Sequence, residues 1–317
     1  MPSKWSPQSP LRLLPGETEA ALPASVNRIT AVTRQEIIER ERRLRPWAVF
    51  GAAAPLVLYM AAQVIETSAG LEVGGLATEQ LRSIDENSQA LLYSSIARAI
   101  GFALLAVPLV YLFRAAQART ERVNGLFLGI VIIGPVLLAT QGLITWSAQT
   151  DVAAQFVEQS PGVGDIYTLA DNIADQSGAL STATGLVLPA MLSLIFAMIY
   201  VPLWAMRTGL LSRFFGTTGM ALGALIIMLL QFALLLVLCW FLYLSLVLMG
   251  RIPRGRPPAW DAGEAIPWPR PGEEEPVAAS EAADVVEGDA TEIPGVGENP
   301  NAARRERAKR RKRKRRH

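Results

Sequence analysis

The stretch that decides the fold is GTTGMALGALIIMLLQFALLLVLCWFLYLSLVLM, residues 216–249, which contains no charged side chain and no proline. As one straight helix it would run about 51 Å, whereas the hydrocarbon core of a bilayer is about 30 Å thick. Two short spans, residues 216–230 and 232–249, fit better, with Gln231 at the turn between them. Whether this stretch crosses the membrane once or twice decides which side the chain after Met249 occupies.

The whole chain has the composition of a multi-pass membrane protein. Of its 317 residues 51% are hydrophobic, and the charged residues cluster in blocks between apolar runs. The net charge of +2 hides an asymmetry, because residues 304–316 hold eleven Lys or Arg residues while the rest of the chain holds 19 basic and 27 acidic residues. We therefore expect an all-α, multi-pass transmembrane helical bundle that ends in a basic tail.

Cysteine and histidine are nearly absent, which removes several classes of chemistry. Cys239 is the only cysteine and His317 the only histidine. A disulfide within the chain, a Cys/His zinc site and a histidine-dependent catalytic triad are therefore excluded. Cys239 lies among large apolar residues, which favours a lipid-facing or packed thiol over a reactive one. The sequence predicts no cofactor, no metal site and no enzymatic activity.

Four further apolar segments precede the deciding stretch. They cover residues 46–65, 91–113, 123–146 and 178–206. Residues 1–29 contain five prolines and no apolar periodicity, which predicts a disordered leader. Residues 30–45 predict a cytoplasmic juxtamembrane helix with Thr33 as N-cap, Glu36 in capping-box position and Pro46 as its stop. This helix either lies on the membrane surface or leads, solvated, into the first span.

The flanking charges predict the topology. Basic residues mark cytoplasmic loops, and arginines flank the N-terminal side of the first span and follow the second, fourth and last apolar segments. The loops 66–90 and 147–177 are strongly acidic and belong outside. Because the chain is cytoplasmic both at Arg213 and after Met249, an even number of crossings must separate them. We predict six spans within a bundle over residues 46–250 in the cell membrane, with both termini cytoplasmic; the alternative is five spans with an external C-terminus.

The C-terminal region divides into an acidic linker and a polybasic tail. Residues 251–303 are rich in proline and acidic residues, and Trp260 and Trp268 rest either on the membrane interface or on the cytoplasmic ends of the spans. In the tail, residues 304–317, each Lys or Arg near an anionic leaflet is worth about 1 kcal/mol. The expected partners are the lipid bilayer and its anionic lipids, or a protein or ribosome. The candidate lipid-binding residues are Arg310, Arg311, Lys312, Arg313, Lys314, Arg315 and Arg316.

Arg98 is the one ionisable residue well inside an apolar span. A charge at this depth is expected to be paired or to snorkel to the interface. Glu66 is the natural partner, and Asp171 and Asp175 are alternatives. The pair is either a structural salt bridge or a counter-ion site on a solute pathway, and the structural interpretation is favoured.

Two weaker patterns leave alternatives open. The acidic loop residues Asp165, Asp171 and Asp175 could attract a cation, but they lack the spacing of a calcium loop and are expected to be solvated. Gly219 and Gly223 have GxxxG spacing, which indicates close helix packing within the chain or, as the lesser alternative, dimerisation.

Two segments carry a resemblance to a known group. MRTGLLSRFFGTTGMALG (residues 206–223) and GRIPRGRPPAWDAGEAIPWPRPGE (residues 250–273), above all GRPPAW followed by EAIPWP, resemble multi-pass actinobacterial membrane proteins classed as a domain of unknown function. The resemblance spans about residues 33–273. It implies a membrane location and a last apolar stretch split into two helices, and it brings no catalytic residues.

These observations favour a non-enzymatic membrane scaffold or accessory protein with a lipid- or partner-binding basic tail. The alternative is a small transporter or channel-like protein in which Arg98 and the acidic loops handle a charged solute. A closed bundle favours the first function and a midplane cavity at Arg98 the second.

Overall fold

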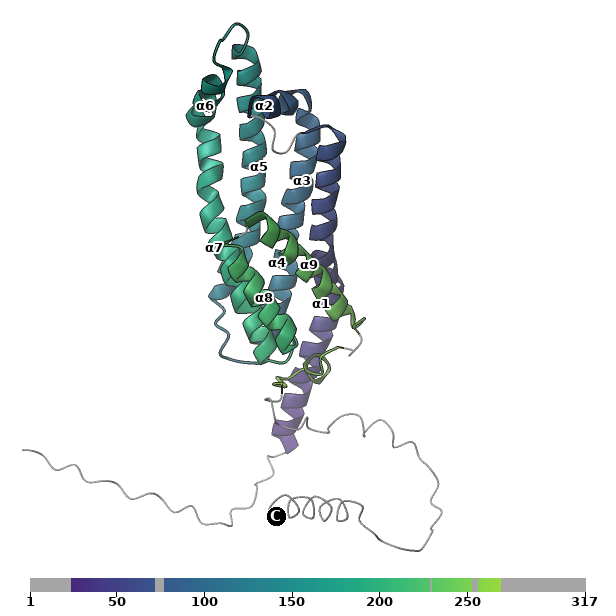
Figure 1. Ribbon diagram of the computed structural model, residues 1–317. Helices are drawn as coiled ribbons and strands as arrows, with labels where there is room; N and C mark the ends of the chain where they lie inside the picture. The colour runs from purple at the N-terminus through teal and green to yellow at the C-terminus, as the bar shows by residue number, and fades with distance from the viewer. Residues whose placement is uncertain (1–23, 72–76, 229, 253–255, 269–317) are drawn as a thin grey trace, which may run out of the picture. The chain divides into compact units, whose positions relative to one another are not determined.

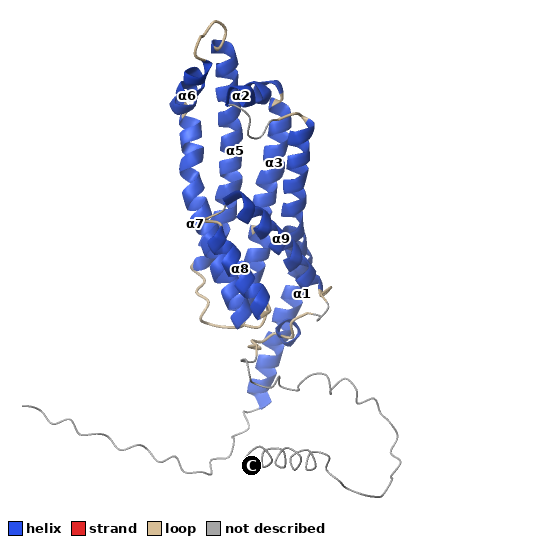
Figure 2. Ribbon diagram, in the orientation of Figure 1, coloured by secondary structure: helices blue, strands red, loops and turns tan. Residues whose placement is uncertain are grey.

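The computed structural model describes residues 24–71, 77–228, 230–252 and 256–268. Helices and their connections make up this part of the chain, without a strand (Figure 2). In order, the helices are α1 (Ala24–Ser68), α2 (Ala77–Glu86), α3 (Ser88–Leu104), α4 (Ala106–Gln117), α5 (Phe127–Gln159), α6 (Ile166–Gln176), α7 (Gly178–Arg207), α8 (Arg213–Leu225), α9 (Leu230–Met249) and α10 (Ala259–Ala262). The predicted all-α class is confirmed for these residues.

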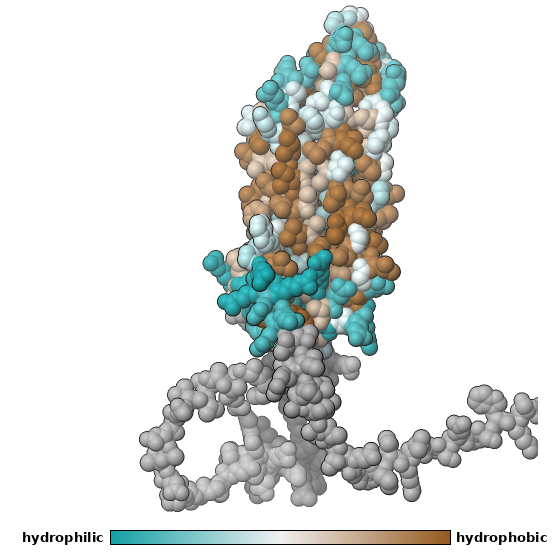
Figure 3. All heavy atoms as spheres, turned by 180° about the vertical axis from the view of Figure 1, so that it is seen from behind, coloured by the Kyte–Doolittle hydropathy of each residue, from teal (hydrophilic) through white to brown (hydrophobic). Residues whose placement is uncertain are grey.

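Among the residues that the structure describes, five helical segments are long and apolar enough to cross a membrane. They are Arg34–Ser68, Ser88–Gln117, Phe127–Gln159, Gly178–Arg207 and Phe232–Met249. On the face shown in Figure 3, a broad hydrophobic band is bordered by hydrophilic residues at both ends, as expected of a protein whose middle lies in lipid. By length and composition, these apolar helices are compatible with an integral membrane protein.

The predicted juxtamembrane helix, residues 30–45, is wrong at both of its ends, because helix α1 extends beyond each. It begins at Ala24, inside the predicted disordered leader, and it runs through Pro46, which was predicted to stop it. Helix propagation is cooperative, and no proline or glycine lies between Pro23 and Arg45. Pro46 has no N–H to donate to the carbonyl of Arg42, so one helical hydrogen bond is lost. Arg42 is exposed, and water can donate to its carbonyl instead. Thr33 and Glu36 therefore lie within a helix and not at its start.

The second span is broken at Leu105 into α3 and α4, three residues before Pro108. The ring of Pro108 and its missing N–H disturb the helical hydrogen bonds of the preceding turn. Helix α3 packs against α1 and α5, whereas α4 packs also against α7. Most of the side chains of α4 are buried, including Leu109, Leu112 and Phe113. The break thus directs α4 into the core of one half of the bundle. This half carries Arg114, Arg119, Arg207 and Arg213 and is called the arginine-rich half, and its outer end the arginine-rich end.

The deciding stretch folds back on itself, but its turn was predicted at the wrong place. The turn occupies Ile226–Met228, and Gln231 lies inside α9. Phe215 and Trp240 stack with ring centroids 4.7 Å apart, and the Trp240 indole N–H donates to the Phe215 carbonyl over 3.1 Å. This pairing sets the register of the two helices, so the turn falls midway between these residues.

Helix α8 is short and covers only part of the length of α7. With 13 residues it is about 20 Å long, less than the thickness of a hydrocarbon core. Cβ atoms added to Gly219 and Gly223 would lie 2.8 Å from the Trp240 side chain and 2.9 Å from the Met198 side chain, so the GxxxG residues pack within the chain. Figure 1 shows α8 and α9 beside the half of the bundle that carries α4.

The opposite, acidic end is closed by two short helices. Helices α2 and α6 lie within the loops 66–90 and 147–177, and both pack on α5 (Figure 1). Small apolar clusters hold them, one around Ile84 and Leu91 and one around Phe156 and Ile173. The acidic loops are therefore largely helical caps on the bundle.

Candidate functional site

The structure brings Arg98 and Glu66 together between α1 and α3, near the acidic end of the bundle. Arg98 Nη2 donates to Glu66 Oε2, and the Ser94 hydroxyl donates to Glu66 Oε1 over 2.7 Å. The Tyr59 ring lies 5.8 Å from the guanidinium carbon of Arg98. Both carboxylate oxygens of Glu66 are thus hydrogen-bonded, as a buried charge requires.

The burial of the pair favours a structural role. The Glu66 side chain is 6% exposed and that of Arg98 26%. Asp171 and Asp175, the other partners considered for Arg98, lie on α6, which packs on α2, α5 and α7 and not on α3. The arrangement is a closed ion pair that joins two spans.

A second, more deeply buried ion pair lies at the arginine-rich end. Arg119, just beyond α4, pairs with Glu41 of α1, and the two side chains are 0% and 9% exposed. Arg119 Nη2 donates to Glu41 Oε2 over 2.9 Å and to the Ala259 carbonyl over 3.0 Å, and Arg119 Nη1 donates to the Ala115 carbonyl over 2.8 Å. One guanidinium therefore joins α1, α4 and the segment that follows α9.

Trp260 is the centre of this assembly. Its ring stacks on Tyr111 at 5.4 Å with an interplanar angle of 10°, and its indole N–H donates to the Leu210 carbonyl over 2.9 Å. The guanidinium carbons of Arg256 and Arg119 lie 4.7 and 5.5 Å from the Trp260 ring, within the range of cation–π attraction. Burial lowers the pKa of the Arg256 guanidinium, which remains protonated at neutral pH. The indole is 1% exposed.

The segment that follows Trp260 continues along the loop between α7 and α8. The Ile266 amide donates to the Thr208 carbonyl over 3.3 Å, and the Trp268 indole N–H donates to the Leu211 carbonyl over 2.8 Å. Arg213 donates to the Trp268 carbonyl over 2.8 Å. Of the two positions considered for the tryptophans, the structure shows the ends of the spans. Residues 256–268 thus form a docked segment on the arginine-rich end of the bundle.

The acidic loop residues considered for a cation do not form a metal site in the described part of the chain. Asp165 is the N-cap of α6, and its carboxylate accepts from the Thr168 amide over 3.2 Å and from the Thr168 hydroxyl over 2.7 Å. These bonds hold the pKa of Asp165 below its ordinary value. Within the described ranges, no three His, Cys, Asp or Glu side chains converge as metal ligands. The candidate lipid-binding residues 310–316 lie outside the described residues.

Sequence reasoning missed the Glu41–Arg119–Trp260 assembly. Arg119 was counted only as a cytoplasmic charge, and Glu41 was not singled out within the predicted juxtamembrane helix. The usable signal was Trp260 in the GRPPAW motif, because a tryptophan after two prolines and two arginines needs a partner for its ring and its N–H.

Comparison with known proteins leaves the chain without a relative that would transfer a function. No protein-family model, curated protein or solved structure matches it. The resemblance to actinobacterial membrane proteins of unknown function stays a prediction.

Proposed function

We propose that this chain is a non-enzymatic membrane scaffold or accessory protein that holds its C-terminal polar region at the cytoplasmic face of the membrane. The observation that carries the proposal is the docked segment 256–268, which the buried Glu41–Arg119 pair and Trp260 fasten to the bundle. The chain that follows Trp268 starts from this fastened position. Because the chain after Trp268 begins at a fixed point on the bundle, the basic tail can reach only a limited region. The effective concentration of the tail near a membrane-surface partner is therefore raised.

In place of the six full spans predicted from the sequence, we propose four full crossings and one re-entrant hairpin, because α8 with 13 residues is too short to cross. Helices α1, α3 with α4, α5 and α7 would cross, and α8 and α9 would enter and leave by the same face. The Arg45 guanidinium, which donates to the Met249 carbonyl over 3.4 Å, supports a common face for the start of the bundle and the end of α9. The hairpin enters and leaves by the same face, so the number of full crossings stays even, as the arginine distribution requires. Both termini are then cytoplasmic.

A labelled tail tests the proposed contact with anionic lipid. In a Cys239→Ala background, Ala308→Cys would carry a polarity-sensitive fluorophore in nanodiscs of phosphatidylcholine with or without phosphatidylglycerol. We expect a blue-shifted emission only with phosphatidylglycerol, reversed by high salt because salt screens surface charge. The same label at Ser280→Cys in the acidic linker is the control. Equal emission from Ala308→Cys in both membranes would refute lipid attachment.

Co-purification from the native membrane tests the accessory role. A partner that is retained by the full chain and lost on deletion of residues 304–317 would support a protein contact through the tail. Flux of a charged solute across proteoliposomes that hold the natural chain would instead support the transporter alternative.

A further inference from the structure

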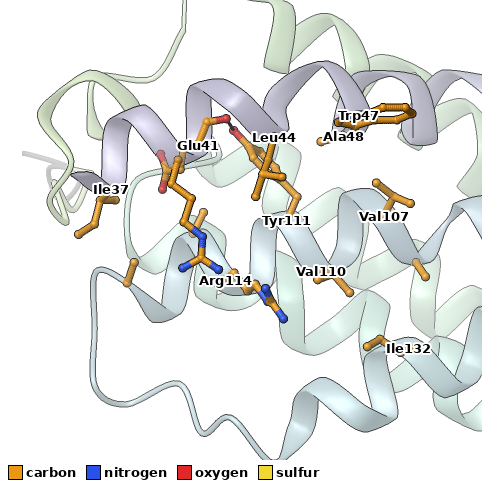
Figure 4. Close-up of a pocket in the computed structure, with 14 residues that line it drawn as sticks. Ile37, Glu41, Leu44, Trp47, Ala48, Val107, Val110, Tyr111, Arg114 and Ile132 are labelled. Atoms are coloured by element: carbon orange, nitrogen blue, oxygen red, sulfur yellow. Dashed lines mark hydrogen bonds between the residues drawn. The ribbon is translucent and has the colours of Figure 1, made fainter. Parts of the chain in front are cut away.

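A groove opens on the side of the bundle between α1 and α5, near the arginine-rich end. Its volume is about 410 Å³, within the range typical of ligand sites. Leu44 and Trp47 of α1 form one wall, Val107 and Val110 of α4 the floor, and Ile132 of α5 the far edge. Figure 4 shows these side chains along the groove.

The groove follows from the break in the second span. Among the described helices, α3 packs against both α1 and α5, but α1 and α5 do not pack against each other. After the break at Leu105, α4 packs against α7 as well as against α1 and α5, so it lies deeper in the bundle and forms the floor of a groove between α1 and α5. Two small residues, Ala106 in α4 and Ala118 directly after it, line the groove and leave it open.

The groove is apolar along its length and basic at one end. Arg40 of α1 and Arg114 of α4 line this end and are both exposed. Glu41 also borders it, but its carboxylate is engaged by the buried Arg119. Neither Arg40 nor Arg114 has an acidic partner within 4 Å among the described residues. Two cations are therefore available to one anion at the mouth of the groove.

The depth of these residues matches the layers of a membrane. Arg40 precedes Trp47 by seven residues, about 10 Å along a helix. Trp47, 68% exposed, has the amphipathic ring typical of the membrane interface, and arginines just outside that level face the phosphate layer. Beyond Trp47 the groove is lined by Val107 and Ala106 and reaches toward the acyl layer.

We propose that this groove binds an anionic glycerophospholipid, with one acyl chain along Val107 and Val110 and the phosphate between Arg40 and Arg114. Charge complementarity selects this occupant, because two exposed arginines without an acidic partner attract an anionic headgroup and add nothing to the binding of a neutral apolar helix. The site lies on the helical bundle and does not involve residues 304–317. It therefore does not rest on the proposed function of the tail.

Native mass spectrometry of the purified full chain tests the site. The protein would be titrated with phosphatidylglycerol or phosphatidylcholine, and the apparent Kd of the tightest lipid compared. We expect phosphatidylglycerol to be preferred, and Arg40→Gln with Arg114→Gln to weaken its binding at least about tenfold. The control pair Arg43→Gln with Arg122→Gln removes the same charge from exposed positions outside the groove and should change the Kd less than about twofold.

A second pair of variants tests the acyl-chain contact. Val110→Phe would fill the floor of the groove and should weaken phosphatidylglycerol binding by a similar factor. Val57→Phe, at a position on α1 that is 63% exposed and outside the groove, should not. Circular dichroism melting would show that each variant is folded, and the arginine pair remains decisive if Val110→Phe is not.

Several outcomes would overturn the proposal. Equal weakening by the two arginine pairs would mean that general charge, and not this groove, attracts the lipid. Equal affinity for phosphatidylcholine would exclude a phosphate clamp specific for anionic lipid. Binding that emerges only after deletion of residues 269–317 would mean that the chain's own acidic segment occupies the groove, and a stoichiometric protein retained there would identify a partner helix instead.

Discussion

A Cβ atom added to Gly209 would lie 2.0 Å from the carbonyl oxygen of Ile266. Gly209 also has φ of +77°, a conformation that other residues rarely adopt. The loop after α7 and the docked segment 256–268 therefore meet at a position that accepts only glycine.

Gly209→Ala should release the end of the docked segment. Both the contact with Ile266 and the backbone strain oppose alanine, so we expect a loss of more than about 1 kcal/mol in the stability of docking. Hydrogen exchange would measure it at the Ile266 amide, which bonds to Thr208. Gly185→Ala, which would meet no atom within 4 Å, is the control. Unchanged exchange at Ile266 would contradict this account of the docking.

Breaking the buried ion pair at the arginine-rich end should cost more than breaking an exposed one. Glu41→Gln leaves the fully buried Arg119 without its counter-ion, and such a loss costs about 3–5 kcal/mol. Glu264→Gln removes the partner of Arg34 in a pair whose side chains are 46% and 53% exposed, where about 0–1 kcal/mol is expected. Thermal unfolding of the two variants in the same detergent would compare them, and similar melting temperatures would refute the ranking.

The Arg98–Glu66 pair should behave as one structural unit. Arg98→Leu leaves the carboxylate of Glu66, 6% exposed, without its counter-ion, so this variant should lose stability. Glu66→Leu in the same chain should restore much of the loss, because the double variant holds no unpaired charge. A double-mutant cycle of unfolding free energies would measure the coupling. Additive losses would mean that the two charges do not interact.

The start of α6 should depend on pH through Asp165. Its pKa is lowered in the folded state by the Thr168 hydrogen bonds, so the stabilisation is present above the ordinary carboxyl pKa of 3.8 and is lost as the pH falls through the folded pKa. Hydrogen exchange of the first α6 amides should therefore rise only in strong acid. Asp165→Asn should keep the N-cap hydrogen bond without this acid sensitivity. Asp165→Ala should lose the N-cap hydrogen bond at all pH values. A cap in Asp165→Ala as stable as in the natural chain would contradict this role.

The hairpin topology predicts which cysteines a water-soluble reagent reaches. In a Cys239→Ala background, Ser212→Cys and Arg251→Cys should react from the same, cytoplasmic side. Met228→Cys, at an 81% exposed position in the turn, should be protected by lipid. Reaction of Met228→Cys from the external side would show that α8 and α9 both cross the membrane fully.

The spans could be predicted because their signal is local. The fourth span, predicted over residues 178–206, is α7 from Gly178 to Arg207, since hydrophobic length and flanking charge are both read within one segment. The ion pair of Arg98 and Glu66 could be predicted for a related reason, because a charge inside an apolar span requires a partner at similar depth.

The features that were missed depend on contacts between distant residues. The turn at Ile226–Met228 follows from the stacking of Phe215 on Trp240, which no local pattern in the apolar stretch reveals. The docking of Trp260 depends likewise on Tyr111, 149 positions earlier in the chain. Such pairs are chosen by the packing of the whole bundle, so their partners cannot be read from one segment.

The limited reach of α8 has a consequence for the surrounding bilayer. A Cβ atom added to Gly223 would lie 3.4 Å from the Ile195 carbonyl oxygen, and Ile195 is only about 18 Å along α7 from Arg207, so in the proposed topology the hairpin would end before the far side of the membrane. In that topology the protein would occupy a larger cross-section in the leaflet beside its arginines than in the opposite leaflet. Such a wedge is accommodated with less lipid strain where the membrane bends outward on the arginine side, and the molecule should therefore concentrate in regions of that curvature.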